Sequence, residues 1–323
     1  MRNMKKNKAF TQKLIILSVL VLLFVFFAVM KPGFASYINV MTIALSTCVN
    51  GLLALGVTFC ITTAGIDLSI GTTMTFSCVM SGIAFSSWGF PLPLAILFGF
   101  VIGGFCGLTS GFAIAKMKLP PFIATLAMQM MTKGLSLVVS GIKPVYFTAA
   151  PNYQQIALGN FMGIEGFYNA FVLFVLGVII AWVLYSKTLL GRYTKAIGSN
   201  EEAARLSGIN TARWKMMVYM VSGLFSAFAG LIMSSRLGSA QPQLGAGYES
   251  EAIAAAVIGG TSMSGGEGSM IGTLIGILII GIIANGLNLL GVAQGPQKMV
   301  KGLIIVVAVI IDVIRRKASQ SAK

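Results

Sequence analysis

Residues 40–64 read VMTIALSTCVNGLLALGVTFCITTA, a run of 25 residues without a charged side chain. A helix of about 20 predominantly apolar residues is long enough to cross the hydrocarbon core of a bilayer. Because lipid offers the backbone no hydrogen-bonding partner, such a segment satisfies its own amide groups by forming a helix. This stretch therefore predicts a helix that spans a membrane.

Further apolar runs lie on both sides of it. Leu14 to Met30 has the basic flank of a signal peptide, but we expect an uncleaved first helix, because nothing after it resembles a secreted domain. The later runs are Ile70 to Phe85, Leu94 to Ala115, Phe122 to Val139, Ala170 to Tyr185, Met216 to Leu237, Ser250 to Gly260, Met270 to Leu290 and Val300 to Ile314. These runs predict an all-α, polytopic transmembrane helix bundle of about ten spans. The eighth, Ser250 to Gly260, is too short to cross unless it is broken, tilted or packed within protein.

The composition supports a membrane protein and narrows its function. The chain of 323 residues is 56% hydrophobic and 10% charged, whereas about a quarter of the residues of a soluble domain are charged. It contains no histidine, which excludes Ser/His and Cys/His nucleophile pairs and histidine metal sites. Its four cysteines lie in apolar runs and are expected to be small buried side chains. We therefore expect no catalytic residue, metal site or cofactor in this chain.

The net charge of +15 is concentrated at a few places. Of the 23 basic residues, 17 lie before the first run, after the fourth, between the sixth and seventh, or at the end of the chain: Arg2, Lys5, Lys6, Lys8, Lys13, Lys116, Lys118, Lys187, Arg192, Lys195, Arg205, Arg213, Lys215, Arg315, Arg316, Lys317 and Lys323. Basic residues mark cytoplasmic loops. Residues 1–323 are thus expected to form one transmembrane domain with cytoplasmic termini, a cytoplasmic loop at 186–215 and external loops at 140–169 and 238–249. A nucleic-acid partner is not expected, because aromatic residues do not alternate with the basic ones.

The 186–215 loop contains the signals of a short helix. Asn200 is a good N-cap, Glu201 and Glu202 suit the positive N-terminal end of a helix, and Gly208 can terminate it about two turns later. A short capped helix outside the membrane suggests a contact with a partner. A solvated loop is the alternative.

A few polar residues fall within or between the spans. Asp67 is the only acidic residue among the first 164 positions, and a carboxylate near lipid either faces water or is held by partners. Asp67 and Ser69 are therefore interpreted as caps of the third span or as part of a pathway or gate. The other candidates for lining a pathway are Asn50, Gln129, Asn285 and Asn288. Hydrogen bonds between helices explain these four residues equally well.

Five motifs follow one another along the chain. They are Gly65-Ile66-Asp67-Leu68-Ser69-Ile70-Gly71, the stretch from Gly191 to Asn210, Ser239-Ala240-Gln241-Pro242 continuing to Gly247-Tyr248-Glu249, Ala252 to Gly268, and Asn285 to Gly291. The second contains Glu202-Ala203-Ala204-x-x-x-Gly208, which resembles the EAA-type loop of permeases of ATP-binding-cassette (ABC) importers. Together the motifs resemble the ribose-type sugar permeases over about residues 38 to 312. The first and third favour the sugar permeases over their distant kin, the branched-chain amino-acid permeases.

This resemblance implies a set of roles. The chain would be the permease subunit of an ABC importer in a bacterial cytoplasmic (inner) membrane, carrying ribose or a similar monosaccharide. Coupling to the ATPase would fall to Gly191, Arg192, Asn200, Glu201, Glu202, Ala203, Ala204, Arg205 and Gly208. An external sugar-binding protein would dock near Glu165, Gln241, Glu249 and Glu251. The implied partners are a second permease copy or close relative and two ATPase subunits, which would bind the ATP and Mg.

Two other classes of function were weighed against this one. A secondary transporter or channel would carry ionisable residues within its spans, and here only Asp67 and Lys133 approach that position. A membrane enzyme would need a nucleophile with its base or a metal site, and none can be assembled. The sequence also lacks the GxxxxGK[ST] motif of a nucleotide-binding loop, so any ATPase is a separate subunit.

Overall fold

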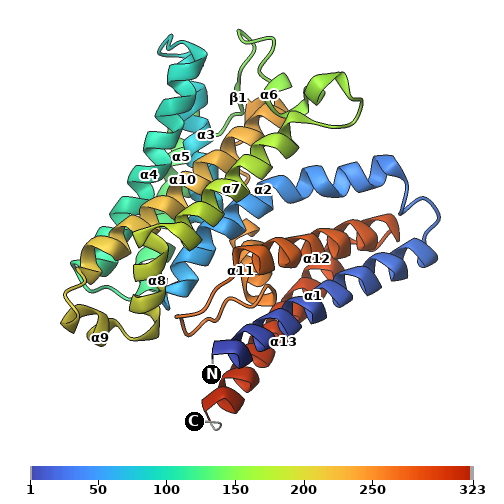
Figure 1. Ribbon diagram of the computed structural model, residues 1–323. Coiled ribbons are helices and arrows are strands. Elements are labelled where there is room, and N and C mark those ends of the chain that lie inside the picture. Colours follow the sequence, from blue (N-terminus) through green and yellow to red (C-terminus); the bar gives the residue numbers. More distant parts are fainter. Residues whose placement is uncertain (1, 321–323) are drawn as a thin grey trace.

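The computed structural model describes residues 2–320, and their side chains at 14–310 and 312–314. The described chain is almost entirely helical (Figure 1). The longer helices are α1 (Arg2–Met30), α2 (Tyr37–Thr62), α3 (Ile70–Ser86), α4 (Leu92–Ala115), α5 (Pro121–Ser140), α7 (Asn169–Lys187), α8 (Leu189–Ser199), α10 (Thr211–Leu237), α11 (Tyr248–Ile258), α12 (Met270–Leu289) and α13 (Gln294–Gln320). The shorter elements are β1 (Val145–Tyr146), α6 (Gln155–Leu158), η1 (Phe161–Gly163), α9 (Glu201–Leu206) and β2 (Ser239–Ala240). The predicted all-α class is confirmed.

Six helices in the described part of the chain are long and apolar enough to cross a bilayer: α2, α4, α5, α7, α10 and α12. Two shorter apolar helices accompany them, Leu14–Met30 within α1 and all of α3. The chain is therefore a multi-pass membrane protein, while the count of about ten spans stays a prediction. The basic clusters before Leu14 and after Ile314 lie outside the residues whose side chains are described.

The two ends of the bundle differ in what they carry (Figure 1). At one end, here called the β1 end, β1 pairs antiparallel with β2, with Val145 opposite Ala240. This pairing joins the 140–169 and 238–249 loops, a contact that the sequence did not predict. At the other end, here called the α9 end, lie α8 and α9, with the beginning of α1 and the end of α13 nearby.

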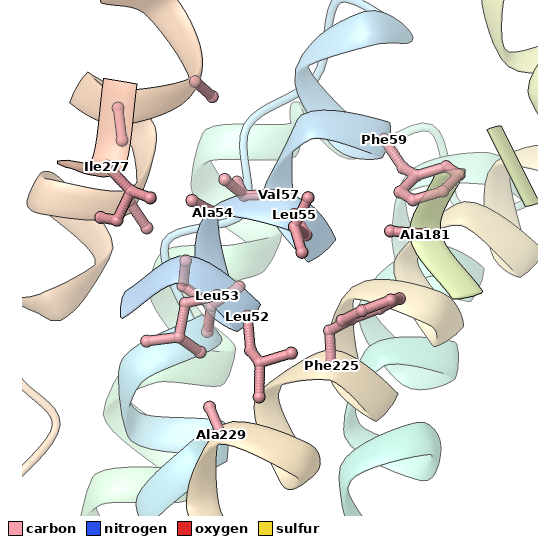
Figure 2. Close-up of a cluster of buried hydrophobic side chains, with 14 of the residues drawn as sticks. Leu52, Leu53, Ala54, Leu55, Val57, Phe59, Ala181, Phe225, Ala229 and Ile277 are labelled. Carbon is pink, nitrogen blue, oxygen red and sulfur yellow. The ribbon is translucent and has the colours of Figure 1, made fainter. Parts of the chain in front are cut away.

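Helix α2 forms the centre of the bundle and packs against α10, α12, α11 and α7. Figure 2 shows Leu52 and Leu53 of α2 between the neighbouring helices, close to Phe225 and Ala229 of α10. Both leucines are fully buried. In lipid, the attraction between helices comes from close packing and hydrogen bonds rather than from a hydrophobic effect. Close packing between side chains therefore holds α2 in the centre of the bundle.

Glycines set the closest helix contacts. A methyl group on Gly107 of α4 would collide with the Tyr219 carbonyl of α10, and one on Gly103 would lie 2.6 Å from the carbonyl oxygen of Gly223. In the same way, Gly276 of α12 lies against the Ala255 carbonyl of α11. Small residues at four-residue spacing thus let these backbones touch, as expected for helices in lipid.

We expect Gly107→Val to lower the thermal stability of the purified chain strongly, because the valine would force α4 away from α10. Overpacking of this kind costs about 1–3 kcal/mol, and more where backbone is the obstacle. Gly134→Val on α5 is the matched control, since nothing lies within 4 Å of a Cβ at that helical glycine. The measurement is thermal unfolding in detergent, and equal melting temperatures for both variants would contradict this packing.

Two non-helical segments meet inside the bundle. Residues 63–69 lead from α2 to the start of α3, and residues 241–247 lead from β2 to the start of α11. Gly71 and Gly245 lie so close that a Cβ on either would collide with the other's carbonyl. Of the alternatives for the short eighth run, broken, tilted or packed within protein, the structure shows a helix of only 11 residues, α11, that follows a non-helical segment and is mostly packed within the bundle.

Candidate functional site

Helix α9 has the local structure that its sequence predicts. The Asn200 side-chain oxygen accepts a hydrogen bond from the Ala203 amide at 2.9 Å, which caps the helix. Glu201 and Glu202 occupy the first turn, next to the positive end of the helix. The chain leaves α9 through Gly208, whose φ of 82° lies in the left-handed region that favours glycine.

The charged side chains of α9 are paired within the chain. Arg205 contacts Glu202 at 2.6 Å, and Lys215 at the start of α10 contacts Glu201 at 2.5 Å. The hydrogen bond and the charge of Glu202 raise the pKa of the Arg205 guanidinium. Both members of the Arg205 pair are largely exposed, so this pair contributes little stability. Leu206 beside it is 79% exposed, which leaves an apolar side chain at the tip of the molecule.

Helix α8 precedes α9 and was missed by the sequence analysis. Three of its buried residues, Leu190, Thr194 and Ile197, are spaced by four and three positions. That helical spacing was the available signal. Two residues predicted to couple to an ATPase lie on this helix: Gly191 packs against the Tyr185 carbonyl, and Arg192 is exposed.

The far end of α8 contacts two other parts of the bundle. A Cβ on Gly198 would collide with the Thr62 carbonyl at the end of α2 and would lie 2.5 Å from the Gly266 amide nitrogen. That amide donates a hydrogen bond to the Thr62 carbonyl at 2.9 Å. On the same helix, the Lys195 ammonium lies 4.1 Å from the centre of the Tyr185 ring, and burial lowers its pKa. Helix α8 thus packs against the end of α2 and against the glycine-rich 259–268 turn.

The same turn is also bound to α13. One carboxylate oxygen of Asp312 accepts hydrogen bonds from the Ser262 hydroxyl and the Met263 amide, both at 3.2 Å. Through these contacts the 259–268 turn joins α2, α8 and α13 at the α9 end.

Asp67 is buried and fully hydrogen-bonded. One carboxylate oxygen accepts from the Ser69 amide at 3.0 Å and the Ser69 hydroxyl at 2.7 Å, and the other accepts from the Ser222 hydroxyl of α10 at 2.8 Å. Ser69 is the N-cap residue of α3 but makes no side-chain cap bond. The expected capping of α3 by these two side chains is therefore wrong. Asp67 instead fixes the turn before α3 and attaches it to α10.

Asn50 and Glu251 belong to a second polar cluster. The Glu251 carboxylate accepts from the Asn50 amide at 2.7 Å and pairs with Lys301 of α13 at 2.5 Å. The Glu251 and Lys301 side chains are 24% and 25% exposed. Glu251, expected near a docking surface, therefore lies between α2, α11 and α13. An ion pair at this position holds α13 to the bundle.

We expect Lys301→Met to destabilise the chain, because it leaves the Glu251 carboxylate without its cation. Removing one partner of a fully buried pair costs about 3–5 kcal/mol, and we expect a smaller loss here because the pair is partly exposed; replacing both partners is often close to neutral. The double variant Glu251→Gln/Lys301→Met should therefore recover most of the melting temperature lost by the single variant. Thermal unfolding in detergent measures both, and an unaffected single variant would contradict the pair.

The other predicted residues do not form one site. The Asn285 oxygen accepts from the Asn39 amide at 3.0 Å, a contact between helices, whereas Asn288 is exposed near the end of α12. Gln129 is half-buried on α5. Gln241 donates to the Ser239 hydroxyl at 2.9 Å beside β2.

Two acidic residues complete the set. Glu165 lies in the segment between η1 and α7, where its backbone carbonyl accepts from the Tyr37 hydroxyl at 3.0 Å. The Glu249 carboxylate accepts from the Gly247 amide at the start of α11. No cluster of His, Cys, Asp or Glu that could hold a metal occurs among the described residues.

Comparison with known proteins gives a consistent result. Residues 39–309 match the family described as branched-chain amino acid transport system / permease component. The ribose import permease protein RbsC of Bacillus subtilis (strain 168) is 44% identical over 93% of this chain and 92% of its own length. The RbsC protein of Escherichia coli (strain K12) is 38% identical over 92% of each chain, and the fructose import permease protein FrcC of Rhizobium meliloti is 37% identical over 94% and 86%.

A solved structure of an inward-facing ABC transporter of the metal-chelate type is similar in fold. Its TM-score is 0.50 at 19% sequence identity, and the match covers 94% of this chain and 99% of that one. At this identity the likeness concerns the fold alone.

Proposed function

Because the chain belongs to the branched-chain amino acid transport system / permease component family, whose members are the membrane subunits of ABC transporters, we propose that it forms the translocation pathway for ribose or a similar monosaccharide. It is a transport component, not an enzyme. The observation that carries the choice of substrate is the 44% identity to a ribose import permease along nearly the full length of both chains.

The sugars named for the relatives support a sugar rather than an amino acid. The relatives named above for ribose and fructose both carry sugars, and an L-arabinose transport system permease protein, AraH of Escherichia coli (strain K12), is 36% identical over 94% of this chain. The family description alone names branched-chain amino acids. The printed names of these relatives therefore favour a monosaccharide over the amino acids of the family description.

The α9 end supplies the contact with the partner that hydrolyses ATP. We place the coupling function on α9, with Gly191 and Arg192 of α8 beside it. The exposed Leu206 supports this role, because a single apolar side chain on a short capped helix fits a groove of another subunit. Rigid-body movement of α8 and α9 would carry ATPase closure to α7 and α10, to which they are joined.

The remaining assignments follow from an importer of this kind. Two ATPase subunits would bind ATP and Mg at the cytoplasmic α9 end, and a second permease copy or a close relative would complete the pathway. An external sugar-binding protein would dock at the β1 end, near Glu165 and Gln241. Glu249, expected there as well, lies instead beside Gly71 at the start of α3. The membrane would be the bacterial inner membrane.

The substrate is tested by uptake into liposomes that contain the assembled transporter. Radiolabelled ribose, fructose, L-arabinose and leucine are compared, each with its own purified binding protein. We expect ATP-dependent uptake of one of the sugars and none of leucine. Uptake of leucine alone would overturn the choice of a monosaccharide.

A further inference from the structure

The crossing of Gly71 and Gly245 lies deep in the bundle. Gly82 of α3 packs against Val145 of β1, so Gly71, eleven residues earlier in the chain, lies about 16 Å below the β1 end at 1.5 Å per helical residue. From the same crossing, the 11 residues of α11 extend about 16 Å towards the 259–268 turn, which touches α8. The crossing is therefore about equally far from both ends.

The non-helical segment at this depth is buried only in part: Pro242 and Gly245 are buried. Gln243, Ala246 and Gly247 are exposed residues, and Ser250 in the first turn of α11 is exposed as well. Irregular backbone at membrane depth is tolerated only where it is buried in protein or lines a water-filled cavity. Lipid is therefore excluded as the neighbour of this segment in the assembled transporter.

Helix α5 adds two polar side chains on the same side. The Lys133 ammonium donates to the Gln243 carbonyl at 2.7 Å and to the Pro242 carbonyl at 3.3 Å. Gln129 is one helical turn away from Lys133 and so lies on the same flank of α5. The side-chain amide of Gln129 makes no hydrogen bond to another residue in the described part of the chain.

Gln129 and Glu249 lie at similar depth. Thr132 of α5 donates to Thr72 of α3 at 2.8 Å, and seven residues earlier Thr125 donates to the Ile66 carbonyl at 3.3 Å, so α5 runs in the same direction as α3. Three residues earlier on each helix, Gln129 is therefore level with the start of α3. A Cβ at Gly71 would lie 3.1 Å from a Glu249 carboxylate oxygen, which places Glu249 at that level too.

We propose that Gln129, Lys133, Gln243, Glu249 and Ser250 form a polar strip that holds the hydroxyl groups of the sugar during its passage. This inference rests on the proposed import of a monosaccharide. The strip offers one cation, one carboxylate, two amides and a hydroxyl, so it presents both donors and acceptors at no net charge. This set suits a neutral polyol, because each hydroxyl group of a sugar can both donate and accept a hydrogen bond. Because the strip lies on the surface of one copy, a second permease subunit closes the pathway around it.

Substituted cysteines test this placement, since the native thiols Cys48, Cys60, Cys78 and Cys106 are all buried. Gln129→Cys and Ser250→Cys are compared with Met130→Cys, a matched control on α5 whose native side chain is 71% exposed. The complex is reconstituted with its ATPase and binding protein, and a membrane-impermeant methanethiosulfonate is added during turnover. We expect both strip cysteines to react at least about tenfold faster than Met130→Cys, because the reactive thiolate does not form in lipid. The sugar that the complex imports should slow their reaction and not that of the control.

The outcomes separate this inference from the proposed function. Unreactive strip cysteines in a complex that still imports its sugar would overturn the inference alone. Reactive cysteines that the imported sugar does not protect would show a water-filled surface without a sugar contact and would also overturn it. Import of none of the tested sugars would overturn the proposed function itself. Gln243→Cys replaces any strip variant that fails to assemble.

Discussion

Gly208→Val is expected to abolish the ATP hydrolysis that the sugar-loaded binding protein stimulates, while the chain still inserts and assembles. Gly208 has a φ of 82°, and a β-branched residue at such an angle costs about 1–3 kcal/mol of strain. Each 1.4 kcal/mol corresponds to about a tenfold change in an equilibrium, so the end of α9 would unwind in most molecules. The measurement is the ATPase rate of the reconstituted complex with and without loaded binding protein.

Gly208→Asn is the matched control for this variant. Nothing lies within 4 Å of a Cβ at this position, so added volume is not the obstacle, and asparagine tolerates the left-handed conformation. Stimulation should therefore be largely kept. Glu202→Lys tests the same helix independently, because it puts a cation at the positive end of α9 and removes the partner of Arg205. Normal stimulation in both Gly208→Val and Glu202→Lys would mean that α9 is not the coupling element.

The second large effect is expected at Gly198, where α8 touches the end of α2 and the 259–268 turn. Gly198→Val would separate the backbones that the Gly266 to Thr62 hydrogen bond holds together. We expect sugar uptake to fall about tenfold or more, since displacing packed backbone costs 1–3 kcal/mol or more. Basal ATP hydrolysis should remain, because α9 itself is untouched. Uptake and ATPase rate are measured on the same liposomes.

Gly302→Val on α13 is the control, being a helical glycine with open space around its Cβ. If Gly198→Val and Gly302→Val import sugar equally well, α8 does not transmit movement to α2. Loss of uptake together with loss of the assembled complex would instead show a folding defect, which size-exclusion chromatography of the complex detects.

Much of the fold could be predicted from the sequence because the signals are local. The apolar run Leu94 to Ala115 corresponds to α4 at Leu92–Ala115, since charge and turn residues end the run where the helix ends. The cap at Asn200 and the stop at Gly208 also depend only on neighbouring residues, and both are confirmed. Helix α8 was missed because its apolar face is narrow and its other side is polar.

The contacts between distant segments could not be predicted in this way. Glu251 finds its cation, Lys301, fifty residues later, and no local pattern identifies that partner. The carboxylate was therefore assigned to an external docking surface. Likewise, the glycines at 71 and 245 carry turn signals, but their mutual contact depends on how two broken elements pack. For the polar strip beside this contact, the sequence alone could predict only that Gln129 and Lys133 lie on one face of a helix.

The most direct test of an ATP-driven importer is to purify this chain in mild detergent from its own cells, identify the proteins that accompany it by mass spectrometry, and assay the product in liposomes. We expect an ATP-binding subunit in about equal amount, as expected of the membrane component of an ABC transporter, and sugar uptake that requires ATP. Recovery of this chain alone, folded and importing sugar without ATP, would contradict an ATP-driven importer and would identify a secondary transporter.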